Sequence, residues 1–399
     1  MPRPVTFSLS LLLMLALTAT ASLAVADSDQ RIRFATLNAA MGLAKHGQLS
    51  ERLRAGNDPD LRKLAEVVQR TRPDVLLLSE IDYLPGDRQA EWLAQYLARS
   101  ESGLEPVEYA YHFSAPVNTG VQSGLDIDGN GQTGDPADAW GYGRFPGQYG
   151  MLLLSRYPID RQGMRSFQYF LWRDMPAALR PVLPGGADFY TDETWNQLRL
   201  SSKSHWDIPI AIHGQTIHLL ASHPTPPAYD GPEDRNGARN HDEIRLWKDY
   251  ITPGSAGYLV DDTGATGGLP AGAAFVIAGD LNADIHDGGS RDKAITQLLR
   301  HPRVNATCEP RSEGAVEASQ VQGQANLQHR ADPALDTGDF SDAQVGNLRA
   351  DYVLPSANLA VSGCGVFWPR AGEPGAEAAA FSDHRLVWLD IILPASVRP

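Results

Sequence analysis

The residues of this sequence that could do chemistry gather where apolar stretches end, and the clearest case is Phe275 to Asp284. Residues 275–279 are apolar or small, as in a buried strand, and Asp280 and Asn282 follow them. Because side chains two residues apart on an extended chain point the same way, a carboxylate and an amide leave the sheet together. Layered α/β proteins bind ligands at this edge. The alternative interpretation is a strand followed by an ordinary Asp/Asn turn.

The same arrangement recurs along the chain, which weakens the ordinary explanation. Further polar residues lie at the ends or starts of apolar stretches: Asn38, Glu80, His223, Asp351, Asp383 and His384. Each of them alone has a structural explanation, such as a turn cap or a surface ion pair. Buried carboxylates must be paired or bound to a cation. A set with this many oxygen donors suits Mg²⁺ or Mn²⁺, with waters and a substrate phosphate completing the coordination.

The elements that must position these residues follow from the hydrophobic periodicity. Predicted strands are residues 31–38, 74–80, 150–156, 196–212 (a pair), 217–223, 275–279, 349–355 and 381–391; predicted helices are residues 60–70, 91–99, 242–250 and 293–299. The strand, helix, strand order at residues 31–80 favours a parallel pair of neighbours. Residues 114–149, 253–273 and 310–345 are predicted to be loops or surface excursions. We expect an α/β fold in one domain, residues 27–399.

Six of these sites carry a family resemblance. Asn38, Leu-Leu-Leu-Ser-Glu80, His223-Pro, Gly-Asp280-Leu-Asn282, Asp351-Tyr and Ser-Asp383-His384 occur in the order seen in the endonuclease/exonuclease/phosphatase superfamily. This superfamily includes pancreatic-type deoxyribonucleases, AP endonucleases, neutral sphingomyelinases and inositol-polyphosphate 5-phosphatases. The resemblance covers nearly the whole chain after the leader. It implies a four-layer α/β sandwich of two packed mixed β-sheets flanked by helices, and hydrolysis of phosphate esters.

The resemblance also implies a ligand set for a divalent cation. Glu80 would be the principal ligand of Mg²⁺ (or Mn²⁺), with Asn38 and Asp383 beside it.

The remaining matched residues would act on the substrate. Asp280 and Asn282 would position the attacking water or the phosphate. His384, oriented by Asp351, would be the general base or an electrostatic stabiliser. His223 would contact the phosphate and serve as general acid to the leaving oxygen. This pair of histidines resembles the deoxyribonuclease and sphingomyelinase branches more than the AP endonuclease branch.

Three segments depart from those four branches and resemble uncharacterised secreted bacterial members instead: residues 114–149, 202–207 and 224–241. They contain the cations that we expect to face substrate oxygens, namely Lys203, His205, Arg235 and Arg239. Surface salt bridges to acidic neighbours are the alternative.

A second cation site is suggested by the run Asp126-Ile-Asp128-Gly-Asn130-Gly. Oxygen side chains at alternate positions followed by glycine resemble the first half of a calcium-binding loop. The terminal bidentate acid is missing, because position twelve of the loop is Ala137. The sequence therefore predicts either a structural Ca²⁺ site or a cluster of Asp/Gly turns.

The first 26 residues have the pattern of a secretory leader. Arg3 supplies the positive charge, residues 7–17 the apolar core, and residues 24–26 an A-x-A cleavage site. We expect cleavage after Ala26 and a secreted or periplasmic protein, with an uncleaved membrane anchor as the alternative. In an oxidising compartment Cys308 and Cys364 are expected to form a disulfide, the alternative being two unpaired thiols.

Charge and composition bear on the substrate. The chain has 42% hydrophobic and 21% charged residues, as a globular protein does, and its net charge of −14 becomes −15 when Arg3 leaves with the leader. This charge disfavours long-range attraction to nucleic acid. We expect a monomeric phosphoesterase, without stable membrane insertion, that acts on a small or lipid-derived phosphate ester. The alternatives are a secreted nuclease that scavenges phosphate from DNA or RNA and, in another class, a non-catalytic exported binding protein.

Overall fold

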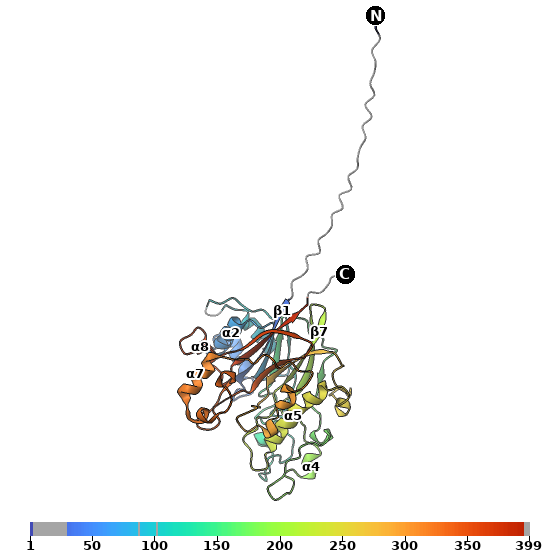
Figure 1. Ribbon diagram of the computed structural model, residues 1–399. Coiled ribbons are helices and arrows are strands. Elements are labelled where there is room, and N and C mark those ends of the chain that lie inside the picture. The colour runs from blue at the N-terminus through green and yellow to red at the C-terminus, as the bar shows by residue number, and fades with distance from the viewer. Residues whose placement is uncertain (3–29, 87, 101–102, 395–399) are drawn as a thin grey trace.

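The two large β-sheets of the protein pack face to face, with helices on both outer sides (Figure 1). The computed structural model describes residues 1–2, 30–86, 88–100 and 103–394. Apart from its first two residues, the predicted leader lies outside the described residues. Among the described residues, none of the helices has the length and apolar character that crossing a membrane requires.

One sheet has six strands. Their order is β12 (Ala360–Phe367), β13 (Leu386–Leu393), β1 (Gln30–Met41), β2 (Val75–Ile81), β4 (Met151–Ser155) and β3 (Tyr111–Phe113). Strands β1 and β2 run parallel, as predicted, and the other neighbouring pairs run antiparallel. The carboxyl ends of β1 and β2 therefore leave this sheet at the same edge.

The other sheet has five strands. Their order is β11 (Asp351–Pro355), β8 (Ala274–Asp280), β7 (Gln215–Ser222), β6 (His205–Ile212) and β5 (Arg165–Ser166). Strands β7 and β8 run parallel, whereas β11 runs antiparallel to β8 with Asp351 opposite Asp280. The ends of β7 and β8 and the start of β11 thus share one edge. Because β1 packs against β8 across the two sheets, this edge lies next to the ends of β1 and β2.

Alternation along the strands creates the layers. In β2, Val75 and Leu77 belong to the core between the sheets, while Leu76 and Leu78 face the helices outside. In β8, Val276 lies between the sheets and Ile277 on the outer side. Strands that are apolar on both faces need cover on both sides, so the predicted four-layer sandwich of mixed sheets is confirmed.

The helices provide that outer cover. They are α1 (Gln48–Ala55), α2 (Pro59–Thr71), α3 (Gln89–Leu97), α4 (Asp192–Trp195), α5 (Arg235–Ile251), α6 (Thr296–Leu299), α7 (Glu313–Gln322) and α8 (Ala376–Ala379). Helix α2 begins where Asp58 accepts backbone N–H bonds and Pro59 supplies the first turn. Its apolar stripe, which includes Leu61, Leu64 and Val68, packs on the six-stranded sheet. Helix α5 covers the five-stranded sheet with Ile244, Leu246 and Trp247.

Several predicted segments differ from the structure, and the strand predicted at residues 381–391 begins only at Leu386. The strand pair predicted at residues 196–212 is a single strand, β6, and residues 196–204 form no strand. Residues 310–345 contain helix α7 and β9 (Gly338–Asp339), which pairs with β10 (Asn347–Leu348); small residues at the buried positions of α7, such as Gly314 and Ala315, hid its apolar face. Helix α5 begins seven residues before the predicted start, because its first two turns bury polar side chains.

A disulfide joins Cys308 to Cys364, as predicted. Cys364 lies in the edge strand β12, and Cys308 lies in the segment that leads to α7. The bond therefore ties the excursion between β8 and β11 to the edge of the six-stranded sheet.

Candidate active site

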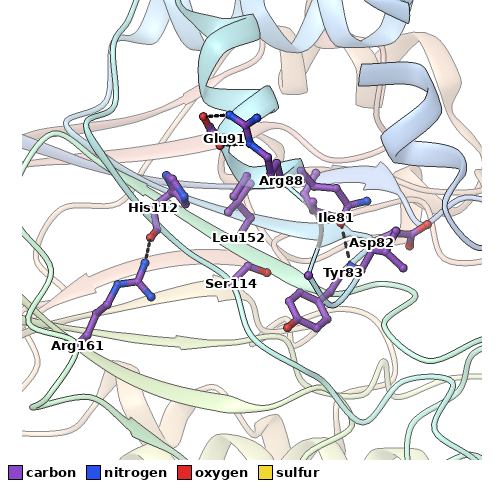
Figure 2. Close-up of a pocket in the computed structure, with 13 residues that line it drawn as sticks. Ile81, Asp82, Tyr83, Arg88, Glu91, His112, Ser114, Leu152 and Arg161 are labelled. Atoms are coloured by element: carbon purple, nitrogen blue, oxygen red, sulfur yellow. Dashed lines mark hydrogen bonds and ion pairs between the residues drawn. The ribbon is translucent and has the colours of Figure 1, made fainter. Parts of the chain in front are cut away.

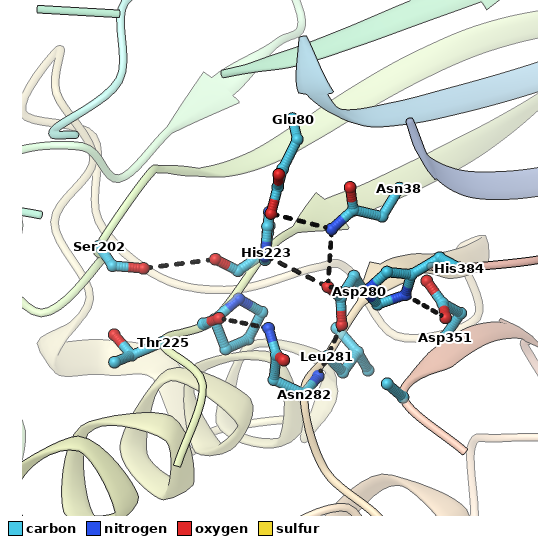
Figure 3. A network of polar contacts seen from close by, with 12 residues as sticks. Asn38, Glu80, Ser202, His223, Thr225, Asp280, Leu281, Asn282, Asp351 and His384 are labelled. Atoms are coloured by element: carbon cyan, nitrogen blue, oxygen red, sulfur yellow. Dashed lines mark hydrogen bonds and ion pairs between the residues drawn. The ribbon is translucent and has the colours of Figure 1, made fainter. Parts of the chain in front are cut away.

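One carboxylate, that of Asp280, lies at the centre of the polar cluster at the shared edge (Figure 3). Its Oδ2 atom is 3.1 Å from Nδ2 of Asn38, 3.3 Å from Nε2 of His223 and 3.6 Å from Nε2 of His384. Its Oδ1 accepts the backbone N–H of Asn282. Burial raises the pKa of this carboxyl to about 7, with the charge of His384 opposing the rise and Asp351 and Glu80 adding to it. Four segments from two sheets therefore meet at one acidic group.

The Asn38 side chain links Asp280 to Glu80. Its amide nitrogen donates to Oε1 of Glu80 and to Oδ2 of Asp280, both at 3.1 Å, while its amide oxygen accepts the N–H of Ala40. In this orientation the amide holds two carboxylates near each other. Asn38 would offer its oxygen to a cation only after a half-turn of the amide group.

His384 is held from three sides. Its Nδ1 atom is 2.8 Å from Oδ2 of Asp351, its backbone N–H donates to Oγ of Ser382, and the ring of Phe340 meets it edge-on. Asp351 also accepts from Oγ1 of Thr337. Burial lowers the pKa of the imidazole, but the carboxylates of Asp351 and Asp280 together raise it to about 10. His384 is thus a fixed positive charge at neutral pH.

The pKa of His223 is shifted in the opposite direction to that of His384. Burial, followed by the charges of Lys203 and His384, holds the pKa of its imidazole well below the usual value. Nε2 faces Asp280, whereas the buried Nδ1 has no hydrogen-bond partner among the described residues. The ring is therefore neutral and has a nitrogen available for a further partner.

Asn282 and Asp383 border the cluster. The amide nitrogen of Asn282 donates to the carbonyl of Pro224, and its backbone has a φ of 50°, a left-handed conformation that asparagine tolerates. Asp383 is exposed, and its charge contributes to the raised pKa of His384. The roles that the resemblance implies for these two residues stay predictions.

Lys203 lies close to the carboxylates of Glu80 and Asp280. The residue is 7% exposed, and its amine has no hydrogen-bond or ion-pair partner within the described ranges. Burial lowers its pKa, and the nearby negative charges of Glu243, Glu80 and Asp280 oppose that change. A buried amine without a direct partner, close to two site carboxylates, is suited to bind an anion.

The other three predicted cations have partners elsewhere. His205 contacts Oγ of Ser201 and the carbonyl of Glu243 through its two ring nitrogens. Arg239 donates to the carbonyl oxygens of residues 140, 199 and 200, and Arg235 pairs with Glu233. These contacts give the three side chains structural roles, and they do not support the prediction that the three bind substrate.

Glu243 is a residue that the sequence analysis missed. It is fully buried on α5, and its two carboxylate oxygens accept the N–H groups of Ser202 and Thr225 at 2.7 and 2.6 Å. It thereby holds the segments that carry Lys203 and His223. An acid on the apolar side of an amphipathic helix was the available signal.

The predicted calcium loop gains an acidic residue in the structure. Asp126, Asp128 and the buried Asp138 bring carboxylate oxygens within 4.8 Å of one another. The missing terminal acid is thus supplied one position after Ala137. Asn130 donates to Asp128 and Asp135, and several of the carboxylate oxygens accept backbone N–H groups of the loop. Calcium binding here stays a prediction.

The central cluster fits a divalent cation. Asp280, Asp351 and His384 offer ligand atoms within 4.8 Å of one another, and one oxygen of Asp351 is buried without a partner among the described residues. In this trio the positive charge of His384 offsets part of the negative charge of the two carboxylates. Between Glu80 and Asp280 the link is the neutral amide of Asn38, which offsets no charge. Hard oxygen donors in excess of nearby cations are what Mg²⁺ or Mn²⁺ requires.

Comparisons with known proteins identify the family of this chain. The model of the Endonuclease/Exonuclease/phosphatase family matches residues 35–384. Among solved structures, an endonuclease/exonuclease/phosphatase from Beutenbergia cavernae is 18% identical, with a TM-score of 0.50 over 91% of this chain and 72% of its own. A family protein from Leptotrichia buccalis (14%, TM-score 0.46, 90% and 99%) and beta toxin from Staphylococcus aureus (14%, 0.47, 90% and 99%) are also similar.

A search of curated proteins finds no match to this sequence. Similarity to solved structures at these identities speaks for the fold alone. The family match, however, extends from β1 to His384 and so includes every residue of the cluster around Asp280. The chain belongs to the endonuclease/exonuclease/phosphatase family.

Proposed function

We propose that this protein is an exported, divalent-cation-dependent hydrolase of phosphate esters. The observation that carries the proposal is the meeting of Asn38, His223 and His384 on one oxygen of Asp280, with Glu80 on the far side of Asn38. Phosphoester hydrolysis needs an oriented water, compensation of phosphate charge and help for the leaving oxygen. This cluster can meet each need with a different group.

Each residue would have a distinct role in hydrolysis. Bound to Glu80, Asp383 and Asn38, Mg²⁺ or Mn²⁺ would supply positive charge that offsets the phosphate oxygens. Asp280 and Asn282 orient the attacking water. His384, held by Asp351, presents a fixed positive charge to the phosphate, which favours the stabiliser role over that of general base. His223 faces the leaving oxygen.

Lys203 is proposed to bind a non-bridging oxygen of the phosphate. Its support is a buried amine without a direct partner near Glu80 and Asp280. With Arg235 and Arg239 bonded elsewhere, Lys203 and His384 are the cations that the chain itself brings to the substrate.

We propose a small or lipid-derived phosphate ester as the substrate, because the net charge of −14 opposes attraction to polyanions. Export is proposed from the leader pattern and supported by the disulfide.

A substrate panel tests the proposal. Full-length protein assayed with Mg²⁺ and with Mn²⁺ should hydrolyse bis-p-nitrophenyl phosphate or p-nitrophenyl phosphate, and EDTA should abolish turnover. Asp280→Ala and His384→Ala should each lower kcat by about 10² to 10⁴-fold. Plasmid DNA degraded as efficiently as the small esters would establish the nuclease instead. Activity that survives both substitutions would point to a contaminant and leave a non-catalytic binding protein.

A second variant separates substrate binding from folding. Lys203→Met should reduce kcat/KM by roughly 10 to 100-fold, since a hydrogen bond to a charged group contributes about 1.5–3 kcal/mol. It should not lower stability, because it removes a desolvated charge that has no direct partner. Lys248→Met, at a half-exposed lysine paired with Asp249, is the control and should leave kcat/KM unchanged. Equal loss of activity in both variants would contradict the assignment.

A further inference from the structure

Asp82 is a buried acid outside the set of matched residues. It follows β2 two residues after Glu80 and is 4% exposed. In the part of the chain that the structure describes, no lysine, arginine or histidine forms a salt bridge with it. Asp82 is one of the residues that line a cavity of about 270 Å³, but Figure 2 shows its carboxylate pointing away from Leu152 and Ser114, which line the same cavity. The carboxylate therefore serves some other part of the structure.

Its two oxygens connect three loops of the candidate active site. Oδ2 accepts the N–H of Leu43 at 3.0 Å, and Oδ1 accepts the N–H of Tyr149 at 3.1 Å. Leu43 follows β1, Asp82 follows β2, and Tyr149 precedes β4. Gln148 adds a second tie, because its side chain donates to the carbonyl of Leu43.

The backbone is strained near the ends of β1 and β2 and just before β4. Ala40, Glu80 and Tyr149 have φ values of 48°, 55° and 57°, in the left-handed region that non-glycine residues rarely adopt. Such conformations cost about 1–3 kcal/mol each and persist where surrounding contacts impose them. The two hydrogen bonds of Asp82 act on residues three positions from Ala40, two from Glu80 and at Tyr149 itself. They add to the N–H bond of Ala40 to Asn38 and to that of Ile81 to the carbonyl of Gly150 in maintaining this geometry.

This backbone conformation places the Tyr149 side chain close to Gly42 and Glu80. The Tyr149 ring lies against Gly42, where an added Cβ would be 2.1 Å from the ring. Its phenol is close enough to Glu80, Tyr142 and Arg144 for their charges to act on it. The loops that Asp82 ties together therefore adjoin Glu80 near the end of β2 and carry an aromatic residue close to it.

We propose that Asp82 is a positioning residue, whose carboxylate ties the loops after β1, after β2 and before β4 so that Glu80 is presented to the divalent cation. The inference rests on the proposed function, in which Glu80 holds that cation. A carboxylate can accept both N–H groups, whereas an amide has one oxygen acceptor and turns an NH₂ group toward the other donor. Asp82→Asn should therefore release one of the two loops.

Asp74 provides a matched control. It lies just before β2, at the opposite end of the strand, on the order of 25 Å away. Its carboxylate also joins two neighbours, accepting from the N–H of Arg33 and from the side chain of Arg156. Asp74→Asn thus weakens a similar link without touching the site.

The experiment measures Mn²⁺ binding to EDTA-treated full-length protein by electron paramagnetic resonance, together with thermal unfolding of the metal-free protein. Asp82→Asn should raise the Kd for Mn²⁺ by about 10 to 100-fold, as loss of a residue that orients a metal ligand does, while Asp74→Asn stays within twofold of the wild type. Should Asp82→Asn fail to fold, Asp82→Glu keeps both acceptors but displaces the loops, and it should weaken binding as well.

A Kd within twofold of the wild type for a folded Asp82 variant would overturn the inference, as would an equal loss in Asp74→Asn. Glu80→Gln separates this failure from failure of the proposed function. If the wild type binds no Mn²⁺, or if Glu80→Gln leaves binding intact, Glu80 holds no cation and both proposals fall.

Discussion

The two histidines of the candidate site show how the same side chain acquires opposite properties. Both are buried, and burial disfavours the charged form of each. His384 lies between Asp351 and Asp280, and their carboxylates outweigh this effect. The His223 ring contacts one carboxylate, that of Asp280, among the described residues, and the positive charges of Lys203 and His384 act on it. One site therefore contains a charged and a neutral imidazole at the same pH.

The buried His205 makes a pH-dependent contribution to stability that can be measured. Burial lowers its pKa from 6.5 to about 4, with the charge and the carbonyl of Glu243 opposing the change. Between these pH values the unfolded chain binds the additional proton, so His205 contributes stability above pH 6.5 that is lost as pH falls to 4. The loss is roughly 3 kcal/mol. Urea unfolding of the wild type and of His205→Gln at several pH values from 4 to 7 measures it as a difference, because the shifted pKa values of Asp280 and His223 also affect stability in this range.

His205→Gln removes the titrating group and keeps an N–H donor for the carbonyl of Glu243. We expect it to lower stability at pH 7 but to flatten the decline in unfolding free energy below pH 6.5. The raised pKa of His384 does not interfere, because it alters stability only above pH 6.5. His286→Gln, at an exposed position, controls for the loss of a histidine. An unchanged slope in His205→Gln would show that His205 is not the source.

At the scale of elements, parallel pairing explains why the site forms at one edge. Strands β1 and β2 run parallel in one sheet and β7 and β8 in the other, so their carboxyl ends lie together. Strands β11 and β13 run in the opposite direction and begin at that edge, which brings in Asp351 and the loop with His384. Polar residues at the ends of some strands and polar residues at the starts of other strands can thus belong to the same site.

The disulfide between β12 and the segment before α7 should increase stability and leave the candidate site unaffected. Cys308 and Cys364 are 56 residues apart, and closing a loop of this length restricts the unfolded chain by about 4 kcal/mol. The double variant Cys308→Ser with Cys364→Ser should lose stability on this order in urea, while kcat/KM at 25 °C stays at the wild-type value. Reductant should destabilise the wild type and have no effect on the double variant. A stable double variant would refute this role.

At the scale of the whole molecule, the site depends on the packing of the two sheets. Asn38 and Glu80 come from the six-stranded sheet, and His223 and Asp280 come from the five-stranded sheet. The core between the sheets, which includes Phe34, Leu77, Trp206, Leu219 and Val276, sets how these ends approach. A cation held by Glu80, Asn38 and Asp383, which come from three segments far apart in the chain, would bind the folded protein and not the unfolded chain.

Cation binding should therefore stabilise the fold. At 100 times the Kd, Mg²⁺ should add about 2.7 kcal/mol, which for a chain of this length raises Tm by roughly 3 °C. Differential scanning calorimetry with Mg²⁺ and with EDTA measures the shift. Glu80→Gln should reduce it strongly, whereas Asp74→Asn should retain it. A Tm independent of Mg²⁺ in the wild type would argue against a cation site at this edge.

The sequence by itself determined the residue types at the strand ends and the strands that carry them. Alternating and apolar stretches identified β1, β2, β7 and β8 because burial on one or both faces restricts composition at every position. The order of Asn38, Glu80, His223, Asp280, Asp351 and His384 was enough to indicate the family and its fold. Local pattern also predicted helix α2, whose cap and stripe are contained in its own residues.

Only the tertiary structure decided which polar side chains meet. Trp206 faces the core between the sheets, so the adjacent His205 turns toward α5 and away from the substrate. Arg239 is buried among carbonyl oxygens of distant segments, and Lys203 remains without such partners. Periodicity assigns a residue to a face, but the partners on that face come from elements far away in the chain. Their identity depends on how the two sheets and their loops pack.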